Sequence, residues 1–511
     1  MQQSVARSFL DSVERHRSSN ALITIERAWT YEELGRLTGA VSSFLGSTKL
    51  ERGDRVAIIL PNCPEYVAVF YGIHLAGCVV VALNTQEPAP VLARLLEHCG
   101  ARVLFVDDKL RELPQLRELT SNGDLRVIPV SEDSGEWSEI VSGSLPNFRR
   151  HVVDSRSSDL AAIIYTSGTT GSPKGVMLSQ TNLFANTQSI LNYLPISWVD
   201  RCFNVLAFYY SFGNSILHTH MTAGACLILQ NHVAFPHAVL KRMESEKATS
   251  FYGVPTTFAL LFGRDRLRDA NLSALRYIAQ AGGPMSVAQQ QQLAEDLPGT
   301  EIYVMYGQTE ATARLSYLEP AHLVDKAGSV GKAIPGVTLR VGSSDESKHT
   351  AESPGEVYAF GDNIMSGYWN DSMASSEVLR DGWLRTGDLG YFDNDGFLFL
   401  TGRSSDMIKT GANRVSPAEI EDVIARLDGV AEVGVYAIDD AILGQAVAAA
   451  IVTEPGVELD IQDIQRQCLA GLSSFKVPKS IKFVESLPKT SSGKLKRHVL
   501  VKDYEEREQS E

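Results

Sequence analysis

The sequence lacks paired cysteines, a long hydrophobic run and an excess of basic residues. Its six cysteines are far apart and form no CxxC pair, which in a chain of 511 residues is typical of a reducing compartment and not of a disulfide framework. The most apolar stretch, from Leu75 to Leu83, is about half as long as a bilayer-spanning helix. We therefore expect a cytoplasmic protein with no membrane span.

The balance of charged residues argues against a nucleic-acid-binding protein. The chain has 47 Lys and Arg residues against 61 Asp and Glu residues, a formal net charge of −14. Such a surface repels phosphate backbones, so we expect no nucleic-acid partner, although a local basic pocket for a small polyphosphate is compatible with it. The length suggests about three folding units.

Apolar runs alternate with helix-length amphipathic segments along most of the chain. This alternation predicts βαβ units and parallel sheets covered on both faces. The expected strands are 55–60, 78–82, 102–106, 161–165, 248–252, 275–279 and 301–305, and the clearest helices are 65–76 and 88–99. Residues 328–400 have the short strands and Gly-rich turns of a small barrel or antiparallel sheet, and mixed α and β structure follows Gly402, with a helix at 417–427.

The segment Tyr165 to Gly175 follows one of the buried strands and has the composition of a phosphate cradle. Glycines let backbone N–H groups turn toward an anion, hydroxyls donate further hydrogen bonds, and a lysine adds positive charge. The residues concerned are Thr166, Ser167, Gly168, Thr169, Thr170, Gly171 and Lys174. Their spacing differs from the GxxxxGK[ST] of a P-loop, which argues against a P-loop phosphotransferase.

This segment resembles the signature loop of the adenylate-forming superfamily, which includes acyl-CoA synthetases, adenylation domains and beetle luciferase. The resemblance covers nearly the whole chain, from Thr30-Tyr-Glu-Glu-Leu34 to Lys494, with further motifs in family order. It implies an α/β fold with a large N-terminal ATP- and acyl-binding domain (1–402) of two doubly wound subdomains and a small β-barrel-like subdomain. A smaller, mobile α+β C-terminal domain (403–511) would carry the catalytic lysine.

The same resemblance implies the nucleotide site. Gly282-Gly283-Pro284 would lie against the adenine, and Tyr306-Gly307 would supply the ring that stacks on it. Asp388, in Thr386-Gly387-Asp388, would accept hydrogen bonds from both ribose hydroxyls, with Arg403 beside it.

Three residues would act on the reacting groups. Thr309 resembles a contact to phosphate or to the acyl carboxylate, and Glu310 resembles the ligand of an ATP-bound Mg²⁺, a cation that needs only one or two protein carboxylates. Lys494, in Pro488-Lys-Thr-Ser-Ser-Gly-Lys494, resembles the lysine that bridges the attacking carboxylate and the α-phosphate.

The predicted acyl pocket is mostly apolar, which favours a fatty or an aromatic carboxylic acid. Its expected residues are Tyr210, Ser211, Phe212, Tyr252, Val254 and Met305. Ser211 stands near the position where amino-acid-activating relatives have an aspartate, so an α-amino acid is disfavoured. Tyr210 stands where many acyl-CoA synthetases have a histidine.

The implied reaction has two halves. The acid attacks ATP to give an acyl-adenylate and pyrophosphate, and a phosphopantetheine thiol then takes the acyl group. Coenzyme A is the favoured acceptor, and a carrier protein acting in trans, in a biosynthetic pathway, is the alternative. Two departures concern the second half: Ala412 replaces a glycine beside the pantetheine tunnel, and Ser405 replaces the Asp or Lys of the interdomain hinge.

Two other interpretations remain weaker. A catalytically silent ATP-binding protein would have no reason to keep Lys174, Glu310, Asp388, Arg403 and Lys494 together. The pair His218-Thr-His220 suggests a metal site, but in a helical context residues i and i+2 point apart.

Overall fold

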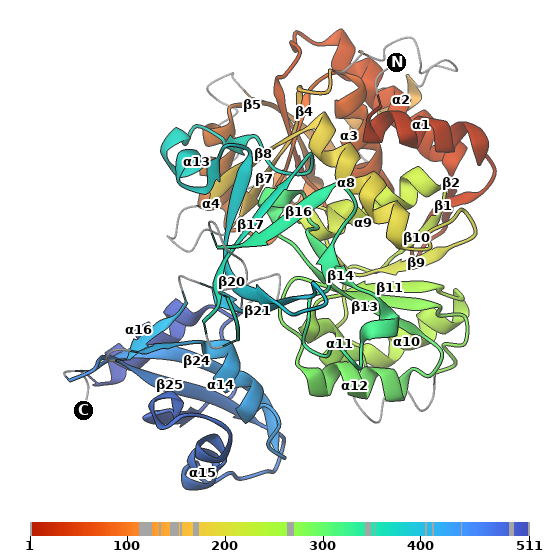
Figure 1. The fold of residues 1–511 in the computed structure, drawn as a ribbon. Coiled ribbons are helices and arrows are strands. Elements are labelled where there is room, and N and C mark those ends of the chain that lie inside the picture. Colours follow the sequence, from red (N-terminus) through yellow and green to blue (C-terminus); the bar gives the residue numbers. More distant parts are fainter. Residues whose placement is uncertain are drawn as a thin grey trace.

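The chain folds into several β-sheets with helices packed against them, as a computed structural model shows (Figure 1). The structure describes residues 3–111, 125–131, 134–143, 153, 156–166, 173–262, 270–342, 349–351, 353–403, 406–410, 413–440, 442–489 and 495–508. Within these ranges no helix has both the length and the apolar composition that crossing a bilayer requires.

A seven-stranded sheet contains the first series of βα units. Alternate residues of β3 and β4 belong to two separate buried clusters, so both faces of this sheet are covered, as its continuous apolar runs predict. In spatial order the strands are β18 (Gly367–Tyr368), β8 (Lys174–Ser179), β7 (Leu160–Thr166), β4 (Val79–Ala82), β3 (Arg55–Ile59), β5 (Ala101–Asp107) and β6 (Arg126–Val130).

A nine-stranded sheet contains the second series. Its strands β13, β12, β11, β9, β10 and β1 are parallel to their neighbours, and antiparallel strands extend both edges. In spatial order the strands are β15 (Lys332–Ala333), β14 (Ser316–Leu318), β13 (Glu301–Tyr306), β12 (Tyr277–Gln280), β11 (Ser250–Gly253), β9 (Arg201–Asn204), β10 (Cys226–Leu229), β1 (Asn20–Ile23) and β2 (Ala28–Thr30).

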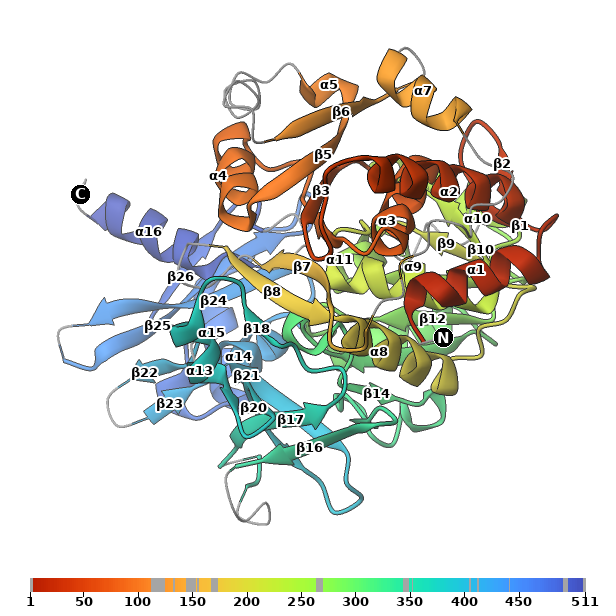
Figure 2. The same ribbon diagram turned by 90° about the horizontal axis from the view of Figure 1, so that it is seen from above.

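Helices of this large part fill the space around the two sheets (Figure 2). They are α1 (Val5–Arg15), α2 (Tyr31–Ser47), α3 (Pro64–Leu75), α4 (Ala89–Cys99), α5 (Asp108–Arg111), α7 (Gly135–Ser142), α8 (Gln180–Tyr193), α9 (Ser211–Ala223), α10 (Pro236–Ser245), α11 (Pro255–Leu261) and α12 (Val287–Asp296). Local sequence sets their ends: Thr30 and Glu33 form a capping box at the start of α2, and each bonds the other's backbone N–H.

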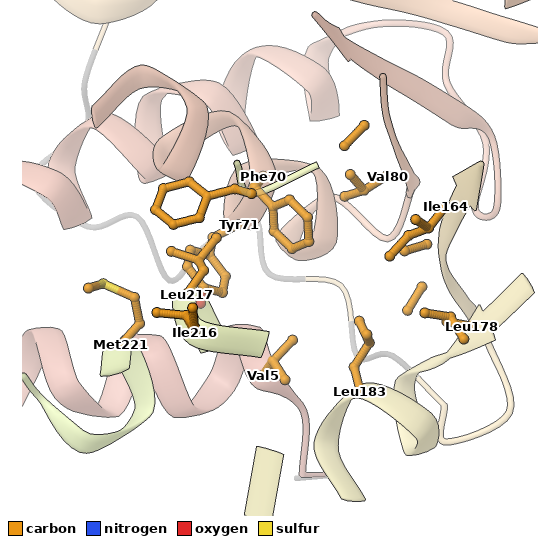
Figure 3. Packing of buried hydrophobic residues seen from close by; sticks show 14 of the residues in the cluster. Val5, Phe70, Tyr71, Val80, Ile164, Leu178, Leu183, Ile216, Leu217 and Met221 are labelled. Carbon is orange, nitrogen blue, oxygen red and sulfur yellow. The ribbon is translucent and has the colours of Figure 1, made fainter. Parts of the chain in front are cut away.

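The largest buried cluster lies among α1, α3, α8, α9 and the seven-stranded sheet. Helix α3 is apolar around its circumference, and all but one of its residues are buried, which is typical of a helix inside a large core. Figure 3 shows Phe70 and Tyr71 of α3 facing Ile216 and Leu217 of α9. Phe9 of α1 stacks on Tyr71 with ring centroids 4.4 Å apart.

A smaller antiparallel sheet follows, where the sequence predicts a small barrel or antiparallel sheet. Its strands are β16 (Val337–Val341), β17 (Gly355–Gly361), β20 (Trp383–Phe392) and β19 (Leu379–Arg380), with β21 (Leu398–Arg403) paired to β20 and helix α13 (Ser372–Val378) nearby. It forms a half-barrel, and Figure 1 shows β20 and β21 extending toward the C-terminal elements.

The C-terminal elements form a separate sheet with buried clusters of its own. Its strands are β22 (Ile408–Thr410), β23 (Asn413–Val415), β24 (Val430–Asp440), β25 (Gly444–Thr453) and β26 (Ser480–Phe483), and its helices are α14 (Pro417–Ile424), α15 (Ile461–Gly471) and α16 (Arg497–Glu508). Ile420, Val435 and Ala449 are fully buried together. The predicted α/β class, with a large N-terminal and a smaller C-terminal part, is confirmed.

Candidate active site

Four neighbouring parallel strands deliver most of the predicted site. Strands β9, β11, β12 and β13 are hydrogen-bonded in sequence order, so their carboxyl ends meet at one edge of the nine-stranded sheet. Ligands of open α/β sheets bind at this edge. The segments that follow the strands are residues 205–213, Val254, residues 281–284 and residues 307–310, and each contains residues predicted for the site.

The predicted phosphate cradle begins where β7 ends. Thr166, the last residue of β7, pairs with Lys174, the first residue of the antiparallel strand β8. The pairing brings the end of β7 and the start of β8 side by side, so the predicted cradle begins at the end of a buried strand. Some predicted residues lie outside the described part of the chain: Ser167, Gly168, Thr169, Thr170, Gly171, Ser405, Ala412 and Lys494.

Asp388 lies at the centre of a buried polar group. Strands β20 and β21 place Asp388 directly opposite Arg403, and the Arg403 Nε lies 3.0 Å from one carboxylate oxygen. The Tyr306 hydroxyl donates to the other oxygen at 2.5 Å. The charge of Asp388 raises the pKa of Arg403, while burial, followed by that same charge, raises the pKa of Tyr306. Tyr306 from β13 and Arg403 from β21, two predicted nucleotide-binding residues, therefore both contact the carboxylate of a third, Asp388.

Glu310 lies in a second polar group, joined to Lys174 through Tyr368. The Tyr368 hydroxyl donates to Glu310 Oε1 at 2.9 Å, and the Lys174 Nζ lies 5.0 Å from the centre of the Tyr368 ring. The charge of Glu310 also acts on Arg403, so the two polar groups are near each other. Burial, followed by the Glu310 charge, raises the pKa of Tyr368 and keeps its proton in place.

Thr309 connects this group to the predicted acyl pocket. Its Oγ1 lies 3.1 Å from the Ser211 Oγ at the start of α9. The 3₁₀ turn η3 (Thr309–Ala311) thus presents Thr309 and Glu310 side by side after β13. Thr309 therefore links the turn that carries Glu310 to the start of α9.

Two residues of the predicted acyl pocket are in direct contact, and two more lie at the ends of neighbouring strands. The Phe212 and Tyr252 rings are 6.4 Å apart in an edge-on arrangement, and both side chains are buried. Val254 packs against Gly282, where an added Cβ would lie 2.9 Å from Val254 Cγ1. Met305 is buried at the end of β13. Tyr210, the residue before α9, accepts a hydrogen bond from Asn84 at 3.4 Å.

The predicted adenine segment has the backbone that its glycines allow. Gly282 has a φ of +89°, which L side chains rarely adopt, and the side-chain amide of Gln280 donates to the carbonyl of Gly283 at 2.6 Å. Pro284 follows and completes the turn before α12. The segment presents backbone and little side chain, as an approach by a flat base requires.

The sequence analysis missed two buried residues of this region, Tyr368 and Arg314. Tyr368 follows Gly367 in a two-residue strand, a pattern too short to predict its contact with Glu310. Arg314, only 1% exposed, follows Thr309 and Glu310 by a few residues and stacks on Phe212. A charged residue between the apolar Ala313 and Leu315 was the available signal for Arg314.

The histidines of α9 lie inside the core and point to different partners. His218 Nδ1 lies 3.0 Å from the Tyr71 hydroxyl, and His220 Nδ1 bonds the carbonyl of Ile216 at 2.9 Å. Burial lowers the pKa of His220 to about 4. Among the described residues no three His, Cys, Asp or Glu side chains are grouped as a metal site would need.

An ionic network continues from Arg403 into the C-terminal sheet. The charge of Asp406 acts on Arg403, and Asp406 also lies 3.4 Å from Arg497 of α16. Arg497 donates twice to Glu421 of α14, at 2.7 and 2.9 Å. Both bonds come from one terminal nitrogen, Nη2, and charge-assisted hydrogen bonds of this kind are stronger than neutral ones.

Comparison with known proteins agrees with this arrangement. The model of the AMP-binding enzyme family matches residues 9–369, and the model of its C-terminal domain matches residues 419–494. The chain is 31% identical over 478 residues to an indoleacetate–CoA ligase of Aromatoleum aromaticum, with 92% of each chain covered. It is 32% identical over 472 residues to a feruloyl-CoA synthase of an Amycolatopsis species, again with 92% of each covered.

A solved structure shows the same fold with a nucleotide bound. The o-succinylbenzoate coenzyme A synthetase of Bacillus subtilis, in complex with ATP and magnesium ion, is 27% identical and superposes with a TM-score of 0.84 over 97% of this chain and 99% of that one. Sequence, fold and site geometry thus agree, and the chain belongs to the family of AMP-binding enzymes as an AMP-forming acid–thiol ligase.

Proposed function

We propose that this enzyme activates a fatty or aromatic carboxylic acid with ATP as an acyl-adenylate, releases pyrophosphate, and transfers the acyl group to coenzyme A. One observation carries the proposal: the Asp388 carboxylate, predicted for the ribose, is contacted by both Tyr306 and Arg403. Glu310 and Lys174 are nearby and are joined through Tyr368. The similarity to CoA ligases of aromatic acids supports the choice of acid and acceptor.

In the first half-reaction the nucleotide is held at its two ends. Asp388 takes the ribose hydroxyls, and its carboxylate is oriented by the ion pair with Arg403 and by the hydrogen bond from Tyr306. Lys174 and the hydroxyl and N–H groups of residues 166–171 hold the phosphates. Positioning lowers the barrier because the attacking acid and the α-phosphorus are brought into one site.

The residues present suit an ATP-bound magnesium ion. Glu310 offers one carboxylate, held by Tyr368 through Oε1 only, and Mg²⁺ on ATP needs one or two carboxylates with water and phosphate oxygens completing its shell. When bound, the ion neutralises phosphate charge. Thr309 and Ser211 face the acid carboxylate, and Lys494 bridges that carboxylate and the α-phosphate as charge develops.

The predicted pocket favours a carboxylic acid whose remaining part, beyond the reacting carboxylate, is apolar. Phe212, Tyr252 and Met305 are buried, and Ser211 stands in place of the aspartate that pairs a substrate ammonium in amino-acid-activating relatives. An α-amino acid would leave that ammonium unpaired in a buried site. The acceptor is a phosphopantetheine thiol, and coenzyme A is preferred over a carrier protein because the similar enzymes are CoA ligases.

The test is ATP–pyrophosphate exchange across fatty, benzoic, anthranilic and amino acids. Exchange with fatty or aromatic acids, followed by AMP release that free coenzyme A accelerates, is expected. Acceleration by a phosphopantetheinylated carrier protein alone would replace coenzyme A as acceptor, and exchange only with amino acids would refute the acid class.

Lys494→Ala tests the mechanism. We expect loss of exchange by at least 100-fold with ATP affinity largely kept, because the lysine acts on charge that develops in the transition state. Lys496→Ala is the matched control, since it removes the same charge two residues away. Near-normal exchange in Lys494→Ala would refute the role of that lysine.

A further inference from the structure

Arg314 is a cation enclosed in the apolar part of the site. Its residue is 1% exposed, and its guanidinium carbon lies 4.2 Å from the centre of the Phe212 ring. Nε donates to the sulfur of Met305 at 3.3 Å, and one terminal nitrogen donates to the carbonyl of its neighbour Ala313 at 3.3 Å. The Tyr193 hydroxyl is a further hydrogen-bond partner, so Arg314 has hydrogen-bond partners, but none of these groups carries a full negative charge.

No carboxylate balances this charge among the residues that the structure describes. The groups that act on Arg314 are the hydroxyls of Tyr193 and Tyr252, while burial lowers its pKa. Arginine keeps its proton in proteins, so burial does not remove the charge. A buried cation without an anion is strongly unfavourable, and a ring face at 4.2 Å offsets only part of that cost.

The backbone holds Arg314 in this position under strain. The two preceding residues, Thr312 and Ala313, have φ angles of +57° and +114°, which non-glycine residues adopt at a cost. Asn363 and Asn186 both donate to the carbonyl of Arg314, at 2.8 and 3.3 Å. Strain of this kind persists where the surroundings impose it, and it is concentrated at functional sites.

The same loop presents the reacting end of the site. Thr309 precedes Arg314 by five residues and contacts Ser211, while Arg314 stacks on Phe212, the residue after Ser211. Gly307 makes the loop possible, because an added Cβ would lie 1.9 Å from the carbonyl oxygen of Ala313. Arg314 and Thr309 therefore face residues that are consecutive in α9, one polar and one aromatic.

We propose that Arg314 binds a second carboxylate of the substrate acid, so that the enzyme prefers a dicarboxylic acid with an apolar body. The proposal rests on the proposed function and narrows its substrate class. A carboxylate is the anion that matches the planar fork of a guanidinium with two parallel hydrogen bonds. It would supply the negative charge that the described protein groups do not.

A monocarboxylic acid of equal length would place a methyl or ring hydrogen against the cation. The guanidinium would then gain no anionic partner, and sites that leave buried polar groups unpaired reject such analogues strongly. The apolar body between the two carboxylates would contact Phe212 and Met305.

The experiment measures ATP–pyrophosphate exchange with matched pairs: hexanoate and adipate, octanoate and suberate, and 3-phenylpropanoate and 3-(4-carboxyphenyl)propanoate. For at least one pair the wild-type kcat/KM for the diacid should exceed that for the monoacid by about 30-fold or more, as expected for a buried charge pair. Arg314→Met should reduce diacid kcat/KM by a similar factor and change the monoacid less than about threefold. Arg314→Lys should recover part of the diacid rate.

Arg340→Met is the control, because it removes another arginine stacked on an aromatic ring, 4.0 Å from the centre of Trp383. Its diacid-to-monoacid ratio should match the wild type. Wild-type preference for monoacids in every pair overturns the proposal, whether or not Arg314→Met folds. Equal losses for mono- and diacids in a folded Arg314→Met also overturn it, since Arg314 would then act on the reacting carboxylate. No exchange with any acid would instead overturn the proposed function itself.

Discussion

Replacing Asp388 with asparagine removes one negative charge from the centre of the predicted ribose site and keeps the side-chain shape. In the wild type both carboxylate oxygens are directed, one by Tyr306 and one by Arg403. A hydrogen bond to a charged acceptor contributes about 1.5–3 kcal/mol and one to a neutral acceptor about 0.5–1.5 kcal/mol. Two ribose hydroxyls should therefore lose about 2–3 kcal/mol together.

This loss corresponds to ATP binding that is weaker by about 30- to 150-fold. The fold itself should change little, because the Arg403 side chain is 41% exposed and pairs with half-exposed cations contribute about 0–1 kcal/mol. Calorimetric titration of Mg-ATP into the variant measures the affinity, and thermal unfolding checks the fold.

Asp381→Asn is the matched control. It makes the same change in charge at a side chain that is 91% exposed, a short distance along the chain, and it should leave ATP affinity unchanged. A folded Asp388→Asn protein that binds ATP within twofold of the wild type would refute the assignment of this carboxylate to the ribose.

Two further predictions concern residues with single, well-defined contacts. Tyr368→Phe keeps the ring beside Lys174 but removes the hydrogen bond to Glu310. The Mg²⁺ concentration for half-maximal exchange should therefore rise about 3- to 10-fold. An unchanged Mg²⁺ dependence would show that Tyr368 does not support a metal ligand. Burial lowers the pKa of His74 to about 3, below its ordinary 6.5. Below pH 6.5 the His74 side chain therefore binds a proton in the unfolded chain but not in the folded protein. As the pH decreases from 7 to 5, this difference lowers the free energy of unfolding by about 2 kcal/mol. His74→Phe should remove that part of the pH dependence in urea unfolding, and an equal slope in both proteins would contradict it.

Much of the fold was predictable because its signals are local. The apolar run 55–60 predicts a strand observed as Arg55–Ile59, and 161–165 predicts one observed as Leu160–Thr166. Both are continuous apolar segments bounded by polar residues, and a parallel sheet covered on both faces requires such segments. Asp388 and Arg403 were predictable from family motifs, and their pairing follows from the hairpin of β20 and β21.

The contacts of Tyr368 and Arg314 were not predictable from the same signals. Tyr368 reaches Glu310 because its two-residue strand pairs with β8, a partner nearly two hundred residues earlier in the chain. Arg314 is buried because its loop folds back on Gly307, and only the assembled site shows that no described carboxylate accompanies it. Long-range pairing and burial of charge depend on the whole tertiary structure and leave little pattern in the local sequence.

The ionic path from Asp388 through Arg403 and Asp406 to Arg497 and Glu421 implies thermodynamic coupling between two parts of the molecule. A nucleotide that competes with Arg403 for Asp388 would change the electrostatic interaction between Arg403 and Asp406. It would thereby affect the ion pairs that Arg497 of α16 forms with Asp406 and with Glu421 of α14. Linkage is reciprocal, so a change in the Arg497 contacts that altered nucleotide affinity would itself respond to nucleotide binding by the same factor.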